Sequence, residues 1–308
     1  MSASIEQTAT QPLSSAIPAE WSTRKHVGLW SDAWRRLRRS SNARVGMAIM
    51  LLFIFLGVVV PFVDPYNPRI DSDLVSRLKP PSAQHWFGTD DQGRDLFRRV
   101  MHGANISLRV GIAAVALSLV LGSAIGLIAG FFGGLTDNLA MRAMDIMLSF
   151  PATLLAIGIV ATRGPGLDNT MLAIGVVNIP RYARLVRSTT LSIKEQDYVM
   201  AAHSIGVKPQ RIIWRHIFPN SLSPIIVQST LSIATAIIEA AALGFLGLGA
   251  QPPTPEWGAM LSDGYKYLTV GAWWVLLFPG LAIMLTVLGF NLLGDGLRDA
   301  LDPRLRVD

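Results

Sequence analysis

The side chains able to act as nucleophiles, bases or metal ligands are few in this sequence, and their spacing matches no catalytic motif. The chain has no cysteine, which excludes disulfides, thiol catalysis and cysteine-ligated metals. The histidines show no metal-ligand spacing; they are His26, His85, His102, His203 and His216. No Gly-x4-Gly-Lys-Ser/Thr phosphate loop is present, so ATP hydrolysis by the usual route is not expected. We predict no catalytic residue, no metal and no cofactor bound by this chain itself.

Two weaker patterns also fail as enzyme sites. Gly244, Gly247 and Gly249 are not spaced like a dinucleotide fingerprint, and no strand is expected before them. The serines of the apolar segments have no histidine or second carboxylate near them in the sequence; they are Ser118, Ser123 and Ser149. An intramembrane enzyme would need such a pair at membrane depth.

Glu239 is the one charged residue of the apolar segment Leu222–Leu248. A carboxylate at membrane depth costs several kcal/mol unless it is paired or hydrated. We therefore expect Glu239 either to line a translocation path or its gate, or to make a structural hydrogen bond to a neighbouring helix. We favour the structural hydrogen bond. Arg142 and Asp145 are three residues apart in another apolar segment, and we expect them to pair on one helix face.

These side chains are carried by long apolar segments. The 308 residues are 51% hydrophobic and 16% charged, whereas soluble domains carry about 25% charge. About 20 apolar residues cross a hydrocarbon core of about 30 Å. The candidate spans are Val45–Val63, Ile106–Phe132, Leu139–Ala161, a segment from Met171, Leu222–Leu248 and Ala272–Leu293. The sequence predicts an all-α membrane protein, and the net charge of +6 sets orientation rather than nucleic-acid binding.

The distribution of charge decides whether the least apolar candidate span crosses the membrane. This candidate starts at Met171 and is interrupted by Arg181, Arg184 and Arg187. The tail before Val45 holds seven Lys or Arg against three acids, and residues 181–215 hold seven against two. The positive-inside rule places both in the cytoplasm, which requires four spans between the tail and this segment. We therefore predict six transmembrane helices with both termini in the cytoplasm.

The predicted organisation follows from these spans. Residues 1–44 form a cytoplasmic tail with a disordered start and a basic segment, 29–39, that either lies on the membrane surface or is a solvated orientation signal. The remaining parts are a first helix 45–63, an external loop 64–105, a core of five helices 106–297 with a cytoplasmic loop 188–220, and a cytoplasmic tail 298–308. The first helix begins too late for a signal peptide, and no small-residue cleavage site follows it.

Gly122, Gly126 and Gly130 recur every four residues on one face of the second span. This spacing is typical of helices that approach closely in lipid, and we expect a helix interface there. Three prolines inside expected spans should kink them, namely Pro151, Pro180 and Pro279.

The loop before Leu222 has the pattern of two short helices. The first has a small apolar face, formed by Tyr198, Ala201, Ala202 and Ile205. Gly206 can end it in a left-handed cap, and Pro209 suits the start of a second helix that Pro219 ends. The second helix has an apolar stripe of Ile212, Ile213 and Ile217, with Arg211 and Arg215 on another face. The pair forms a knob that enters a partner's groove, or an amphipathic loop on the lipid headgroups.

Part of this loop resembles the EAA motif of ABC importer permeases. The matching residues are Met200-Ala201-Ala202, Gly206 and Ile217-Phe218-Pro219, with Met200 in the place of the motif's glutamate. In that family the loop is a coupling helix that docks on an ATPase subunit. The resemblance thus assigns an ATPase-coupling role to Tyr198, Met200, Ala201, Ala202, Gly206, Arg211, Arg215, Ile217 and Pro219.

Three further segments resemble the C-type subunit of dipeptide and oligopeptide permeases: His85–Gly111, Leu243–Gly264 and Leu293–Arg306. The resemblance implies a type I ABC importer permease in the bacterial inner membrane. Its expected partners are a homologous second permease subunit, two cytoplasmic ATPase subunits that bind ATP and Mg, and an external solute-binding protein. Glutathione, nickel chelates and opines are alternative solutes. An ion-coupled secondary transporter is the rival class, and it would place several ionisable groups at midmembrane.

The six-span topology can be tested by labelling. A cysteine placed at Asp71 should react with a membrane-impermeant thiol reagent in intact cells, because the loop 64–105 is expected outside. A cysteine at Lys194 should react only after the membrane is opened. The reverse labelling would refute the charge argument.

Overall fold

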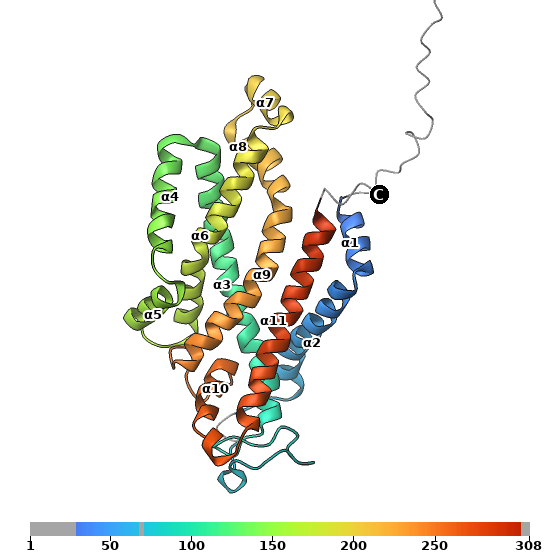
Figure 1. Ribbon diagram of the computed structural model, residues 1–308, viewed down its shortest axis with the longest axis vertical. Coiled ribbons are helices and arrows are strands. Elements are labelled where there is room, and N and C mark those ends of the chain that lie inside the picture. The colour runs from blue at the N-terminus through green and yellow to red at the C-terminus, as the bar shows by residue number, and fades with distance from the viewer. Residues whose placement is uncertain (1–28, 68–70, 303–308) are drawn as a thin grey trace, which may run out of the picture.

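The computed structural model describes residues 29–67 and 71–302, which form an elongated bundle of helices (Figure 1). The predicted disordered start and residues 303–308 of the predicted C-terminal tail lie outside this described part. The α-helices are α1 (Leu29–Arg39), α2 (Ser41–Val63), α3 (Leu96–Phe132), α4 (Gly134–Leu148), α5 (Ala152–Arg163), α6 (Leu167–Lys194), α7 (Asp197–Ser204), α8 (Pro209–Ile212), α9 (Phe218–Phe245), α10 (Trp257–Tyr265) and α11 (Trp274–Leu301). Short turns complete them: η2 (Leu74–Ser76), the π-helical turn η3 (Ile213–Ile217) and η4 (Leu268–Val270).

Four helices of the described residues are long and apolar enough to cross a membrane: α2, α3, the continuous stretch Pro209–Phe245, and α11. The pair α4 and α5 adds a fifth if its two bent halves count as one span. α6 is not among them because its arginines lower its hydropathy, although its 28 residues extend about 42 Å at 1.5 Å per residue. The all-helical membrane fold is confirmed, and six spans are reached only when α6 is counted.

The predicted third span, Leu139–Ala161, is wrong as a single helix. The chain instead forms α4 and α5, which meet at an angle of 88°. Pro151 stands at the break, where it lacks an N–H to continue the helix and disfavours helical backbone at Phe150. The expected kink is therefore a full break. By contrast, α6 and α11 continue through Pro180 and Pro279.

Several helix ends differ from the predicted boundaries, because capping side chains rather than hydropathy set them. α2 begins at Ser41, inside the predicted tail, with Ser40 as its cap. α3 begins at Leu96, inside the predicted external loop, with Asp95 as its cap. At the other end of the chain, α11 continues to Leu301. The basic segment 29–39 is helical, as α1.

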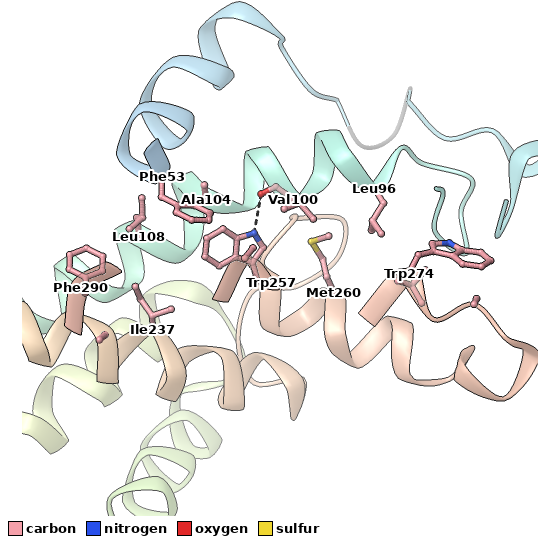
Figure 2. Close-up of a cluster of buried hydrophobic side chains, with 14 residues drawn as sticks. Phe53, Leu96, Val100, Ala104, Leu108, Ile237, Trp257, Met260, Trp274 and Phe290 are labelled. Carbon is pink, nitrogen blue, oxygen red and sulfur yellow. Dashed lines mark hydrogen bonds between the residues drawn. The ribbon is translucent and has the colours of Figure 1, made fainter. Parts of the chain in front are cut away.

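A cluster of buried hydrophobic side chains joins α2, α3, α9, α10 and α11 (Figure 2). Trp257 of α10 is fully buried, and its indole N–H donates a hydrogen bond of 3.0 Å to the carbonyl oxygen of Val100 on α3. Phe53 of α2 packs edge-on against it, with ring centroids 5.7 Å apart. The other labelled members are Leu96, Ala104, Leu108, Ile237, Met260, Trp274 and Phe290. Because the indole N–H is paired, this large ring is buried without an unsatisfied polar group.

The segment 71–95, predicted to lie outside the cell, is held to the bundle by a buried carboxylate. Asp90 accepts hydrogen bonds from the backbone N–H groups of Gln92 at 2.8 Å and Arg94 at 2.9 Å. Its other oxygen accepts from the Arg94 guanidinium at 2.7 Å and from Arg99 of α3. All three charged side chains are buried. Such a network is stable only because each charge is both paired and hydrogen-bonded.

Two contacts tie α11 to the same segment and the end of α2 to α3. The indole N–H of Trp274, the first residue of α11, donates a hydrogen bond of 3.1 Å to the carbonyl oxygen of Thr89. Asp64, just after α2, accepts two hydrogen bonds from Arg98, at 2.7 and 2.6 Å. This bidentate contact holds the pKa of the Asp64 carboxyl below its usual range. Arg98 also pairs with Asp71 at 3.2 Å, so α3 and α11 contact the segment directly and α2 is linked to it through Arg98.

The buried network gives a sharp stability prediction. Asp90→Asn should destabilise the purified protein by about 3–5 kcal/mol, because two buried guanidinium groups lose their counter-charge. The measurement is thermal unfolding of the detergent-solubilised chain. Asp91→Asn is the matched control, since the contacts of Asp91 are longer, 3.9 Å to Arg94 and 3.4 Å to Tyr267. It should change stability by less than about 1 kcal/mol. Equal losses in the two variants would contradict the assigned role of Asp90.

Candidate functional site

The loop between α6 and α9 folds into a knob, residues 197–217, which stands beyond the ends of these two helices (Figure 1). Gly206, with φ of +77°, follows α7. The N–H of Gly206 donates to the carbonyl of His203, and that of Val207 donates to the carbonyl of Ala202. This is the hydrogen-bond pattern of a Schellman cap, which requires a left-handed residue where Gly206 stands. Gly206 thus lies at the turn where the chain changes direction between α7 and α8.

The second helix of the knob is not the separate unit that the sequence predicts. Pro209 starts α8 as expected, but Pro219 does not end the helix. The chain passes through the π-helical turn η3, in which the N–H of Phe218 donates to the carbonyl of Ile213, and continues directly into α9. Because Pro219 falls in the first turn of α9, its missing N–H breaks no essential bond. Residues 188–194 of the predicted loop likewise belong to α6.

Buried side chains hold the knob against the bundle. Ile212 and Ile217 have no exposed surface, and they pack in one cluster with Val199 of α7, Leu127 of α3 and Val186 of α6. A polar contact adds to this packing, since Asn220 of α9 donates a hydrogen bond of 3.2 Å to the hydroxyl of Tyr198. The knob is therefore a rigid extension of α6 and α9 rather than a free loop.

The outer surface of the knob is apolar and basic. Exposed fractions are 81% for Ile205, 65% for Trp214, 50% for Met200 and 46% for Tyr198. Of the predicted small apolar face, only Ala202 is buried; Ala201 is exposed with the others. Basic side chains surround this surface, namely Lys208, Arg211 and Arg215, and all are exposed. A large apolar surface with a basic rim is typical of a protein-binding site.

The glycine face of α3 lies against α6. A methyl group added at Gly126 would come to 2.5 Å from the carbonyl oxygen of Ala183 and to 2.9 Å from the backbone nitrogen of Arg187. At Gly122 it would meet the Cβ of Tyr182 at 2.5 Å. Gly130 sits in the same way against Thr190. The two backbones approach so closely that only glycine fits at these positions of α3.

The membrane-depth charges find partners on α6. Glu239 of α9 is half-buried and accepts a hydrogen bond of 2.9 Å from the side-chain amide of Asn178. The expected pair of Arg142 and Asp145 is wrong. Asp145 instead forms an ion pair of 2.6 Å with Arg184. The two side chains come within reach of each other because α4 lies beside α6.

Sequence reasoning missed two buried acids. One is Asp90, described above. The other is Glu256, which caps α10 by accepting hydrogen bonds from the N–H groups of Gly258 at 2.8 Å and Ala259 at 2.9 Å. Both sit in loop-like sequence with no periodicity, so only their turn-forming neighbours could have drawn attention to them. Among residues 29–67 and 71–302, no three His, Asp or Glu side chains are grouped so that they could hold a metal ion.

Two family models match the chain. Residues 122–307 match the family described as binding-protein-dependent transport system inner membrane component. Residues 28–81 match the N-terminal TM domain of oligopeptide transport permease C. Together they cover the knob and every α-helix except the first part of α3, residues 96–121.

Individual relatives agree with these matches. The dipeptide transport system permease protein DppC of Alkalihalophilus pseudofirmus is 52% identical over 91% of this chain and 91% of its own length. The glutathione transport system permease protein GsiD of Escherichia coli O1:K1 / APEC is 47% identical over 90% of this chain and 91% of its own. Among solved structures, the inward-facing MetNI methionine ABC transporter aligns with a TM-score of 0.55 at 19% identity, over 66% of this chain and 96% of the other, which shows a shared fold.

The glycine interface can be tested with one methyl group. Gly126→Ala should destabilise the purified chain by about 1–3 kcal/mol, because the close contact of α3 and α6 must open. Gly158→Ala is the matched control, since a Cβ there meets nothing within 4 Å. It should leave stability unchanged or raise it slightly. Thermal unfolding in detergent measures both, and a Gly126 variant as stable as the wild type would exclude a tight interface.

Proposed function

The chain belongs to the family of binding-protein-dependent transport system inner membrane components, and we propose that its cytoplasmic knob couples it to an ATPase subunit. It is a permease of the C type found in ABC importers for peptides or a related solute. Members of this family work with ATPase subunits and a binding protein.

The observation that carries the coupling proposal is the knob's exposed apolar surface. Tyr198, Met200, Ile205 and Trp214 face away from the bundle, at the end where the basic residues concentrate. An amphipathic loop on the membrane would turn such residues toward lipid. Here they project beyond the helix ends on a rigid Schellman turn, so a groove with an apolar floor and an acidic rim on a cytoplasmic partner would cover them.

The proposed assembly contains this chain, a homologous second permease subunit, two cytoplasmic ATPase subunits and an external binding protein. The chain sits in the bacterial inner membrane with both termini in the cytoplasm. ATP and Mg bind to the ATPase subunits, since this chain has no phosphate loop. Because the knob is continuous with α9 and packs on α6, closure of the ATPases would move these helices and switch the path between outward-open and inward-open states.

The proposed solute is a dipeptide or another short peptide. The DppC relative is named for dipeptide transport and is the more similar of the two at 52% identity. Glutathione is the alternative, supported by the 47% identical GsiD relative. Uptake of labelled dipeptide and labelled glutathione by the reconstituted importer would distinguish them.

The coupling role predicts a selective phenotype for Gly206. Gly206→Val should abolish solute uptake and the stimulation of ATP hydrolysis by loaded binding protein, while normal amounts of the complex remain in the membrane. A β-branched residue is poorly tolerated at φ of +77°, so the backbone would leave this conformation and α7 would change its direction relative to α8. No atom lies within 4 Å of an added Cβ, so the effect is backbone strain alone.

Gly206→Asn is the control, because asparagine adopts left-handed backbone far more readily than valine. It should retain most of the uptake. The measurements are uptake and ATP hydrolysis in vesicles that contain the assembled importer. If Gly206→Val transports at the wild-type rate, the knob does not transmit the signal and the headgroup-lying loop is the better interpretation.

A further inference from the structure

One exposed face of α6 is polar at membrane depth. Arg181, Arg184, Ser188 and Ser192 follow one another at spacings of three or four residues, and all are exposed. Residues at this spacing lie on one helix face. The opposite face packs on α3 through Tyr182, Ala183 and Val186 and is buried. α6 therefore presents a polar stripe, residues 181, 184, 188 and 192, away from its main contact.

This stripe runs deep into the membrane. Lys194 marks the cytoplasmic end of α6, where its ammonium group donates to the carbonyl oxygen of Phe131 near the end of α3. At 1.5 Å per residue, Arg184 lies about 15 Å and Arg181 about 20 Å along the helix from that end. α6 is about 42 Å long and a hydrocarbon core about 30 Å thick, so a core placed anywhere along α6 contains both Arg181 and Arg184. This corrects the prediction from the charge pattern alone, which places residues 181–215 in the cytoplasm. A charged group that faces lipid within the core is unfavourable. The stripe must face water or another protein.

A cavity opens along the same stripe. Its volume is about 610 Å³, and it is lined by Met141, Asp145, Arg184, Leu185, Arg187 and Ser188. The positive charges in it are largely paired, since Arg184 binds Asp145 and Arg187 binds Asp137. A polar cavity of this size between α4 and α6 has room for water and for a small solute.

Arg181 stands deeper in the membrane than this cavity and is less constrained. No salt bridge joins it to any acid of the described residues 29–67 and 71–302, so its guanidinium remains available. It lies one helical turn from Asn178, which holds Glu239 by a hydrogen bond, and it interacts electrostatically with that carboxylate. A guanidinium whose charge is partly offset by a nearby acid can attract an anion without binding it tightly. Weak binding is required at such a site, because the solute must leave it again to cross the membrane.

We propose that the polar stripe of α6 lines the solute path of this subunit, and that Arg181 guides the carboxylate of a passing solute, such as the C-terminus of a short peptide. This inference rests on the permease function proposed above. The proposal places Glu239 at the rim of the path, where Asn178 holds it by a hydrogen bond. Glu239 would then both join α9 to α6 and border the path.

Water access to the stripe can be measured directly, because the chain has no cysteine of its own. Ser188→Cys should react with a charged, membrane-impermeant thiol reagent added to the cytoplasmic face of vesicles that hold the assembled, nucleotide-free importer. The partner subunits should carry no reactive cysteine. Ala48→Cys is the control, since it is exposed on α2 at a similar depth, about 10 Å along that helix, where it faces lipid. Its reaction should be at least about tenfold slower, because a charged reagent is excluded from lipid.

The role of the charge is tested by uptake of two probes, alanylalanine and glutathione, both of which carry free carboxylates. Arg181→Gln should slow uptake by roughly tenfold, whereas Arg181→Lys should stay within about twofold, because the positive charge is the required feature. Stimulation of ATP hydrolysis by loaded binding protein should remain at the wild-type level in both variants. A merely structural arginine would not separate uptake from ATP hydrolysis in this way.

Three outcomes decide between the proposals. If Ser188→Cys is protected in the assembled importer, the stripe faces a partner subunit and the inference is overturned. Unchanged uptake by Arg181→Gln also overturns it, even when the wild-type importer transports both probes. If the wild-type assembly shows no ATP-driven uptake at all, the proposed function itself fails.

Discussion

The close approach of α3 and α6 is the contact on which the rest of this structure depends. α6 carries three arginines in its second half, so lipid alone would not retain it as a membrane helix. The glycine face of α3 lets the two backbones pack at short range, where van der Waals contact drives helix association in lipid. Arg187 and Lys194 add polar links, to Asp137 of α4 and to the end of α3. One face of α6 is thus committed to packing, and the other is free to be polar.

The knob inherits its rigidity from the same pair of helices. Leu127 of α3 and Val186 of α6 pack in the cluster that buries Ile212 and Ile217. Since the π-helical turn η3 joins the knob to α9 without a loop, a force on the knob acts on a transmembrane helix directly. This arrangement suits the proposed coupling role, in which a movement of a few ångströms at the cytoplasmic end must be transmitted across the membrane.

The two ends of the bundle differ in how they are held. At the end away from the knob, Asp90 with its two arginines and the cluster around Trp257 tie five helices together in a well-packed region. By contrast, α4 buries only Met144 and borders a polar cavity. Much of the surface of α4 is therefore exposed, as the proposed contact with a second permease subunit or with a solute path requires.

The sequence by itself determined the membrane class, most of the spans, the glycine face, and the turn at Gly206, because hydropathy, charge asymmetry and glycine spacing are local properties of the chain. It also carried the family resemblance through the residues around Gly206. Only the tertiary structure decided that Pro151 breaks a span while Pro180 does not, since both prolines carry the same local preference and packing selects the outcome. The partner of Asp145 was likewise invisible, because an ion pair between helices far apart in sequence has no period to detect. Arg94 and Arg99 are close to Asp90 in the sequence, but only the fold buries the three side chains together.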